Sequence, residues 1–225
     1  MTDAASHYAA AAARITAVVT DLDATALATR MAACPEWTVR DVIGHLAGAA
    51  KDVTSNNTAG APGWAWTNAQ VERRASRSLQ AVLEEWQTLV PVVKTFVGRA
   101  PAIVGAILVN DVTAHEHDIL GALGRIGDRD GDTVRFAFEN LLPRIGAKLT
   151  EAEKPALRVV AAGQEYVAGE GEPVATVTGS PFEFIRAFTG RRSRDQLRAL
   201  FTAGDPEPFL DSMSVFEPRP EPLIE

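Results

Sequence analysis

The helical stripe between Pro101 and Gly124 constrains the fold more than any other feature of the chain. Its side chains, spaced by three or four residues, are first apolar, then polar, then apolar again. They are Val104, Leu108, Asp111, His115, Asp118 and Ala122. An apolar stripe on a helix normally faces a protein interior, and a carboxylate buried there needs a partner. The stripe therefore predicts a helical core that encloses a polar site.

Two residues of this stripe, Asp111 and His115, are four positions apart. On a helix such residues share one face, with about 5 to 6 Å between their Cβ atoms, which is close enough to hold one divalent ion. A hydrogen-bonded pair without metal explains the same spacing. His45 offers a third ligand, because it lies on the apolar side of another helical segment. Two histidines and a carboxylate with open positions are typical of catalytic rather than structural metal sites.

Apolar residues recur at helical spacing in five segments, where we expect helices. These are residues 4–30, 39–51, 68–97, 102–124 and 133–148. Thr38 and Asp41 form a variant capping box that predicts the start of the second helix. The connection at residues 54–67 is long, and its Trp64 and Trp66 either cover a substrate pocket or pack the loop.

The residue pattern of the chain changes after residue 154, from helical spacing to short β-branched runs. Residues 157–160 and 173–178 are rich in β-branched side chains and predict two strands, followed by helices at 180–189 and 193–201. Five prolines follow residue 205. We therefore expect a helical metal-binding domain at residues 1–152, a small α/β domain at 153–205 and a proline-rich tail at 206–225.

The composition limits the functional classes. The chain has 225 residues, of which 46% are hydrophobic, and its net charge of -7 argues against nucleic-acid binding. Its one cysteine, Cys34, excludes an intramolecular disulfide and favours the cytoplasm. We find neither a signal peptide nor a segment that is apolar for long enough to span a bilayer. We expect a soluble protein without membrane partners.

Three side chains near these motifs have two interpretations each. Asp118, three residues after His115, either accepts the second ring N–H of that histidine or faces solvent. His117 points to another face of the helix, so we expect it to be exposed or to lie behind the ligands. Cys34 is a soft ligand or reactive thiol in one interpretation and a small buried residue in the other, which we favour.

An acidic turn offers a competing metal site. Counted from Asp128, the residues Asp130, Asp132 and Glu139 fall at the ligand positions of a calcium loop. Thr133 stands where that loop needs glycine for its sharp turn, so we favour a solvated turn.

Three separated motifs resemble those of one family. The runs CPEWTVRDVIGHL at 34–46 and DVTAHEHD at 111–118 resemble two motifs of the mycothiol-dependent maleylpyruvate isomerase family, within the DinB-like metalloprotein superfamily. The first opens the second helix of that family, and the second carries its acidic-xxx-His pair. VTGSP at 177–181 through TGRR at 189–192 resembles the end of its C-terminal domain.

This resemblance implies a fold and a site. The fold class is α+β, with an N-terminal DinB-like four-helix bundle followed by a small α/β C-terminal domain. The divalent metal, usually zinc, falls on His45, Asp111 and His115, with Asp111 standing where the family usually has Glu. Arg191 and Arg192 are candidate donors to the anionic thiol cofactor, mycothiol, although surface arginines explain them as well.

We therefore expect a metal-dependent enzyme that uses this thiol on a small electrophilic substrate, for isomerisation or transfer. The resemblance implies that thiolate adds to a conjugated double bond, that rotation follows, and that elimination returns the thiol. The expected partners are the small-molecule thiol and the substrate, and the chain is a monomer or homodimer. A metal-assisted hydrolase and a non-catalytic ligand-binding or regulatory protein of the same fold are the alternatives.

Overall fold

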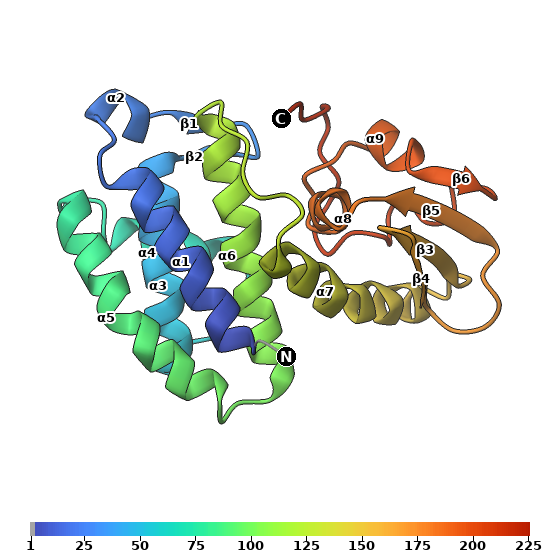
Figure 1. The fold of residues 1–225 in the computed structure, drawn as a ribbon, viewed down its shortest axis with the longest axis horizontal. Coiled ribbons are helices and arrows are strands. Elements are labelled where there is room, and N and C mark those ends of the chain that lie inside the picture. The colour runs from blue at the N-terminus through green and yellow to red at the C-terminus, as the bar shows by residue number, and fades with distance from the viewer. Residues whose placement is uncertain (1–2) are drawn as a thin grey trace. The chain divides into compact units, whose positions relative to one another are not determined.

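The computed structural model describes residues 3–225 and contains two compact units, one ending at Gly127 and the other beginning at Asp128 (Figure 1). The first unit is helical, and the second combines helices with a sheet. This arrangement confirms the predicted α+β class. Over the described residues, no helix combines the length and apolar character that crossing a membrane requires.

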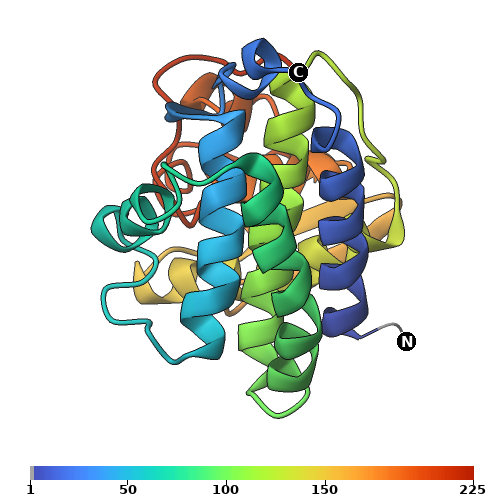
Figure 2. The same cartoon turned by 90° about the vertical axis from the view of Figure 1, so that its left-hand side faces the viewer.

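Four long helices of the first unit lie side by side as a bundle (Figure 2). They are α1 (Ala4–Val19), α3 (Val39–Thr54), α5 (Leu79–Val97) and α6 (Ala102–Ala122). Apolar side chains from each helix are buried between them, which supplies the main stabilising contribution. The bundle predicted from the sequence is therefore present.

Side chains at the helix starts define the bundle locally. The Thr38 hydroxyl accepts the backbone N–H of Asp41, and the Asp41 carboxylate accepts the backbone N–H of Thr38. This is the predicted capping box, and it begins α3 at Val39. Asp3 caps α1, and Ser78 caps α5, by accepting backbone N–H groups in the same way.

Two predicted helices are interrupted. The segment 4–30 contains α1, the short α2 (Ala24–Leu27) and β1 (Arg30–Met31), which pairs antiparallel with β2 (Cys34–Thr38). Asp23 accepts the backbone N–H of Ala26, so its cap begins a new helix inside the predicted one.

The segment 68–97 is divided in the same manner into α4 (Trp64–Glu72) and α5. The Ser78 cap begins α5, and α4 turns to pack against α3. The indole N–H of Trp66 donates to the Asn57 carbonyl at 2.8 Å. This tryptophan therefore packs the preceding loop, which was one of the two roles expected for it. The break gives α4 a separate direction and places one of its faces on α3.

The second unit contains a four-stranded sheet in the order β4-β3-β5-β6. Its strands are β3 (Leu157–Ala161), β4 (Gln164–Ala168), β5 (Ala175–Gly179) and β6 (Phe201–Ala203). β3 pairs antiparallel with β4 and parallel with β5, which pairs antiparallel with β6. The sequence predicted β3 and β5 only. β4 has mostly exposed or half-buried side chains, and β6 is three residues long, so neither carries a strong alternating pattern.

The remaining helices of the second unit are α7 (Asp132–Glu151), α8 (Pro181–Phe188) and α9 (Arg194–Arg198). α7 contacts α8 and β4, with the Phe138 ring against Tyr166 and Phe184. The predicted boundary at residue 152 had assigned this helix to the bundle instead. Residues 206–225 also belong to this unit, because Phe209, Leu210 and Met213 are buried.

Candidate metal centre

Two neighbouring helices of the bundle bring the predicted ligands together. His45 lies on α3, and Asp111 and His115 lie one turn apart on α6. The Nε2 atom of His45 is 3.5 Å from one Asp111 carboxylate oxygen, and the Nε2 atom of His115 is 3.7 Å from the other. One ligand atom from each residue lies within 4.8 Å of the other two.

These distances and donors fit a divalent ion. Zinc bonds of about 2.0 to 2.1 Å in a tetrahedral arrangement separate neighbouring ligand atoms by about 3.3 Å. The separations of 3.5 and 3.7 Å are close to that value. Both imidazoles are buried, whereas the Asp111 side chain is 33% exposed, so the site opens on the side of the carboxylate. Two nitrogens and a carboxylate leave at least one coordination position for water, thiol or substrate.

Each histidine also has a polar side chain beside its second ring nitrogen. The Nδ1 atom of His115 lies 3.0 Å from the buried carboxylate of Asp118, which favours the first of the two interpretations of Asp118 over a solvent-facing one. The Nδ1 atom of His45 lies 2.8 Å from the side-chain oxygen of Gln70 on α4, a contact that the sequence did not predict. Partners of this kind orient the ring and choose which nitrogen faces a metal.

Burial controls the protonation of His115. It lowers the pKa of the imidazole, and it outweighs the carboxylates of Asp118 and Asp111, which raise that pKa. The ring is therefore neutral near neutral pH, which is the form that binds metal.

Two tryptophans lie beside the histidines. The Trp37 ring centre is 4.9 Å from that of His45 and 6.2 Å from that of His115. Trp64 stacks on Trp37 at 5.7 Å and is 57% exposed. Among the described residues, the buried indole N–H of Trp37 has no hydrogen-bond acceptor. The site therefore has an aromatic wall that contains one unused donor.

Comparison with known proteins places this geometry in a family. Residues 8–120, half of the chain, match the family described as the mycothiol maleylpyruvate isomerase N-terminal domain. The chain belongs to this family. The match includes α3, α4 and nearly all of α6, and so every residue of the candidate centre.

Solved structures show the same fold. The crystal structure of the mycothiol-dependent maleylpyruvate isomerase matches with a TM-score of 0.61 at 14% identity, covering 85% of this chain and 92% of that one. A mutant of that isomerase, with alanine in place of a histidine, matches with a TM-score of 0.60 and the same identity and coverage. Among curated proteins, none matches this chain.

In this member of the mycothiol maleylpyruvate isomerase family, Cys34 lies next to Asp118, on the Nδ1 side of His115. Its sulfur is 3.5 Å from the Asp118 carboxylate, and Cys34, His115 and Asp118 form a second close group of ligand-type atoms. Cys34 is half-buried, so the favoured interpretation as a small buried residue holds only in part. His117 is buried on another face of α6.

The two arginines proposed for the cofactor lie in the second unit. The Arg192 guanidinium is buried and donates to the carboxylates of Glu183 and Glu225, each at 2.9 Å. Burial lowers the pKa of Arg192, but these two carboxylates raise it by more. Because two internal anions already engage Arg192, its contacts favour a structural role, and its role as a cofactor donor stays a prediction. Arg191 donates to the Thr189 carbonyl at 2.8 Å and remains a prediction.

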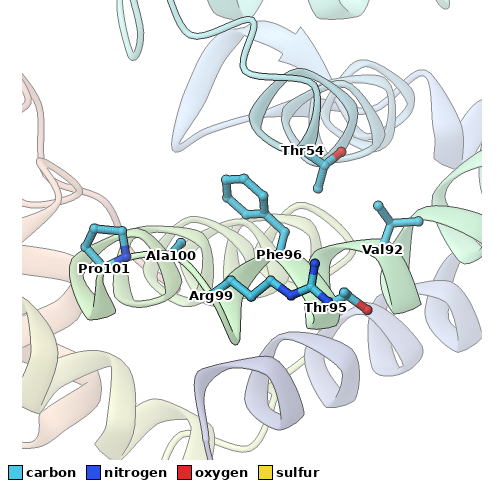
Figure 3. Close-up of a pocket in the computed structure, with 7 residues that line it drawn as sticks. All are labelled: Thr54, Val92, Thr95, Phe96, Arg99, Ala100 and Pro101. Atoms are coloured by element: carbon cyan, nitrogen blue, oxygen red, sulfur yellow. The ribbon is translucent and has the colours of Figure 1, made fainter.

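The calcium alternative gains no support from the geometry. Within residues 3–225, the close groups of three ligand-type side chains are the two described above, and neither includes the turn at 128–132. A surface pocket of the first unit also lacks every predicted ligand (Figure 3). Its lining residues are Thr54, Val92, Thr95, Phe96, Arg99, Ala100 and Pro101.

Proposed function

We propose that this chain is a divalent-metal-dependent enzyme that uses a small thiol, mycothiol, to isomerise or modify a small electrophilic substrate. The observation that carries the proposal is the convergence of two imidazole Nε2 atoms on the Asp111 carboxylate, at 3.5 and 3.7 Å. Zinc is the ion we propose, since two histidines and one carboxylate are a common ligand set of catalytic zinc.

The family supports the choice of cofactor. The matching structures are of a mycothiol-dependent maleylpyruvate isomerase, and from this likeness we propose an isomerisation of the maleylpyruvate type. We propose a cytoplasmic location, because reducing surroundings keep a thiol cofactor in its reduced form.

The residues of the chain have separate tasks in this proposal. His45, Asp111 and His115 would hold the ion, which, when bound, lowers the pKa of a coordinating thiol and polarises a carbonyl group. The partly exposed Asp111 lies on the open side, where thiol and substrate would enter. Trp37 and Trp64 offer a flat apolar surface to a conjugated substrate and exclude water from one side of the site.

Metal analysis of the purified chain tests the ligand set. We expect about one zinc per chain, and loss of most of that zinc in His45→Ala and in His115→Ala. His117→Ala is the matched control, because His117 is buried on the same helix but outside the group. Full zinc occupancy in both ligand variants would contradict the proposal.

A turnover assay then separates the functional classes. The zinc-loaded chain is supplied with unsaturated acids and other electrophiles, with and without mycothiol. Turnover that requires mycothiol supports the isomerase or transferase. Hydrolysis of esters or amides without thiol would instead support the metal-assisted hydrolase, and tight binding without turnover would support the non-catalytic protein.

A further inference from the structure

Gln70 occupies a central position between two polar side chains of α3. It lies on α4, and its side chain is completely buried. Its amide oxygen is 2.8 Å from Nδ1 of His45, and its amide nitrogen donates to the Asp52 carboxylate at 2.9 Å. A fully buried amide with partners on both sides connects the candidate ligand to an internal anion.

Asp52 determines which way the amide of Gln70 is oriented. A carboxylate that receives the Arg73 guanidinium at 2.6 Å and the Asn57 amide at 3.0 Å is acting as an acceptor. Only the nitrogen of the Gln70 amide can donate to it. The amide oxygen must therefore face His45, and exchanging the two amide atoms would place two acceptors, the amide oxygen and the carboxylate, against each other.

The orientation of the amide determines the tautomer of His45. An amide oxygen only accepts, so Nδ1 of His45 must carry the hydrogen. In a neutral imidazole the other nitrogen, Nε2, then has a free lone pair. That atom is the one that lies 3.5 Å from Asp111.

From this chain of contacts we propose that Gln70, oriented by Asp52, is a positioning residue that holds His45 in the tautomer that can bind metal. The inference rests on the proposed metal-dependent function and adds a residue to it. The Nδ1 atom of His115 lies 3.0 Å from the carboxylate of Asp118, so the neighbours of the two histidines differ in charge. A neutral amide fixes the ring of His45 without adding a second negative charge beside the site.

The packing of α4 on α3 is built around Gln70. Arg74, in the turn just after α4, donates to the backbone carbonyl of Gln70 at 3.1 Å and pairs with Glu85 of α5. Gly48 of α3 lies directly below the Gln70 side chain and leaves room for it. Contacts therefore hold Gln70 both at its side-chain amide and at its backbone carbonyl.

Nitrogen NMR of the metal-free full chain tests the tautomer directly. Long-range proton–nitrogen spectra distinguish an imidazole protonated at Nδ1 from one protonated at Nε2. We expect the Nδ1–H form of His45 in the wild-type chain and a mixture shifted toward the Nε2–H form in Gln70→Leu. Asn68→Leu is the control, because it removes a half-buried amide of the same helix whose exposed hydrogen bond goes to Glu72. A wild-type Nε2–H form, or no change in Gln70→Leu, would overturn the inference.

A swapped pair of variants separates positioning from simple packing. In Gln70→Glu with Asp52→Asn, the new carboxylate accepts from both His45 and Asn at position 52, so the hydrogen returns to Nδ1. We expect the double variant to restore the Nδ1–H form that Gln70→Leu loses. Failure of the folded double variant to restore it would count against a role through hydrogen bonding.

Zinc affinity gives the second measurement. Competition with a chelator should show affinity about 10- to 100-fold weaker in Gln70→Leu, and recovered in the double variant, with no change in Asn68→Leu. If the wild-type chain binds no zinc but the tautomer responds as expected, the proposed function fails and the positioning role of Gln70 stands. If zinc binds and Gln70→Leu changes neither tautomer nor affinity, the positioning role fails and the proposed function stands.

Discussion

Gly48 and Gln70 face each other across the contact between α3 and α4. A Cβ atom added at Gly48 would lie 2.7 Å from Cγ of Gln70 and 2.9 Å from the Arg74 guanidinium. Such contacts force side chains to move, so we expect Gly48→Ala to lower the free energy of unfolding by about 1 to 3 kcal/mol. Urea denaturation measures this change. The same variant should shift His45 away from the Nδ1–H tautomer, because Gln70 is displaced.

Gly44, one turn earlier on α3, provides the control for this variant. A Cβ atom there would meet Cβ of Arg74 at 3.6 Å, which is an ordinary contact. Gly44→Ala should therefore stabilise the helix by up to about 1 kcal/mol, through the higher helix propensity of alanine. Equal destabilisation by both variants would show that the close approach at Gly48 is not the cause.

The pair formed by Arg14 and Glu116 joins α1 to α6. Arg14 donates through two nitrogens to the two oxygens of Glu116, at 2.6 and 2.7 Å. Glu116 is buried and Arg14 is 40% exposed. Arg14→Met leaves a buried carboxylate without this partner, and we expect a loss of roughly 1 to 3 kcal/mol in the free energy of unfolding, at the lower end because solvent reaches the pair.

Arg135→Met is the comparison for that pair. Arg135 lies 3.6 Å from Asp132, and both side chains are exposed. Pairs of this kind contribute little, so the change should stay within about 0.5 kcal/mol. For the Arg14 pair, the double variant Arg14→Met with Glu116→Gln should be more stable than Arg14→Met alone, because Glu116→Gln removes the buried charge. If Arg14→Met and Arg135→Met lower the free energy of unfolding equally, the Arg14–Glu116 pair does not stabilise the bundle as proposed.

Local rules, together with the resemblance of the motifs, predicted which side chains would form the candidate centre. Helical spacing places Asp111 and His115 on one face, and the capping box at Thr38 fixes the start of the helix that carries His45. The stripe on α6 then requires a neighbour that accommodates its polar residues. Asp118 follows from the same spacing, since three residues separate it from His115.

Gln70 could not be predicted because its position depends on a long-range contact. The sequence favoured one helix over residues 68–97, in which the direction of Gln70 is set by α5. The break before Ser78 frees α4 to pack on α3 instead. Gly48, a glycine inside an amphipathic helix, was the available signal that another element approaches closely.

The place of α7 in the second unit could not be predicted from the sequence for a related reason. Its apolar face fits either a helical bundle or a sheet, and helical periodicity does not distinguish the two. In the structure Phe138 packs against Tyr166 of β4 and Phe184 of α8. Only the partner residues, distant in sequence, decide between the two units.

Two buried tryptophans, Trp37 and Trp86, allow a test of whether the indole N–H of Trp37 lacks a hydrogen-bond acceptor. The Trp86 N–H donates to the Tyr8 hydroxyl at 2.9 Å, and burial raises the pKa of Tyr8, which keeps it a neutral acceptor. The Trp37 N–H has no acceptor among the described residues. Trp86→Phe therefore breaks a buried hydrogen bond and Trp37→Phe does not, so Trp86→Phe should lower the free energy of unfolding by about 1 to 3 kcal/mol more. Equal losses in urea denaturation would show that the Trp37 donor is satisfied in solution.

The ion pairs of the buried Glu225 carboxylate make the free energy of unfolding depend on pH. Its carboxylate accepts from Arg186 through two bonds of 2.7 Å and from Arg192 at 2.9 Å. Burial raises the pKa of Glu225, but the two guanidinium groups lower it by more, so it lies below 4.5, the ordinary value. The folded state then binds this proton less readily than the unfolded state, and the stabilisation is present above pH 4.5 and lost as the pH falls through the folded pKa.

Urea denaturation at a series of pH values measures this loss. We expect the free energy of unfolding of the wild-type chain to fall as the pH drops below 4.5, and Glu225→Gln to be less stable at about pH 6 with a shallower fall. Glu207→Gln is the control. The pKa of Glu207 is lowered chiefly by the hydrogen bond from Arg198, but this pair is exposed, so salt should cancel its contribution while leaving that of Glu225. If Glu225→Gln keeps the full wild-type slope, the carboxylate that titrates lies elsewhere in the chain.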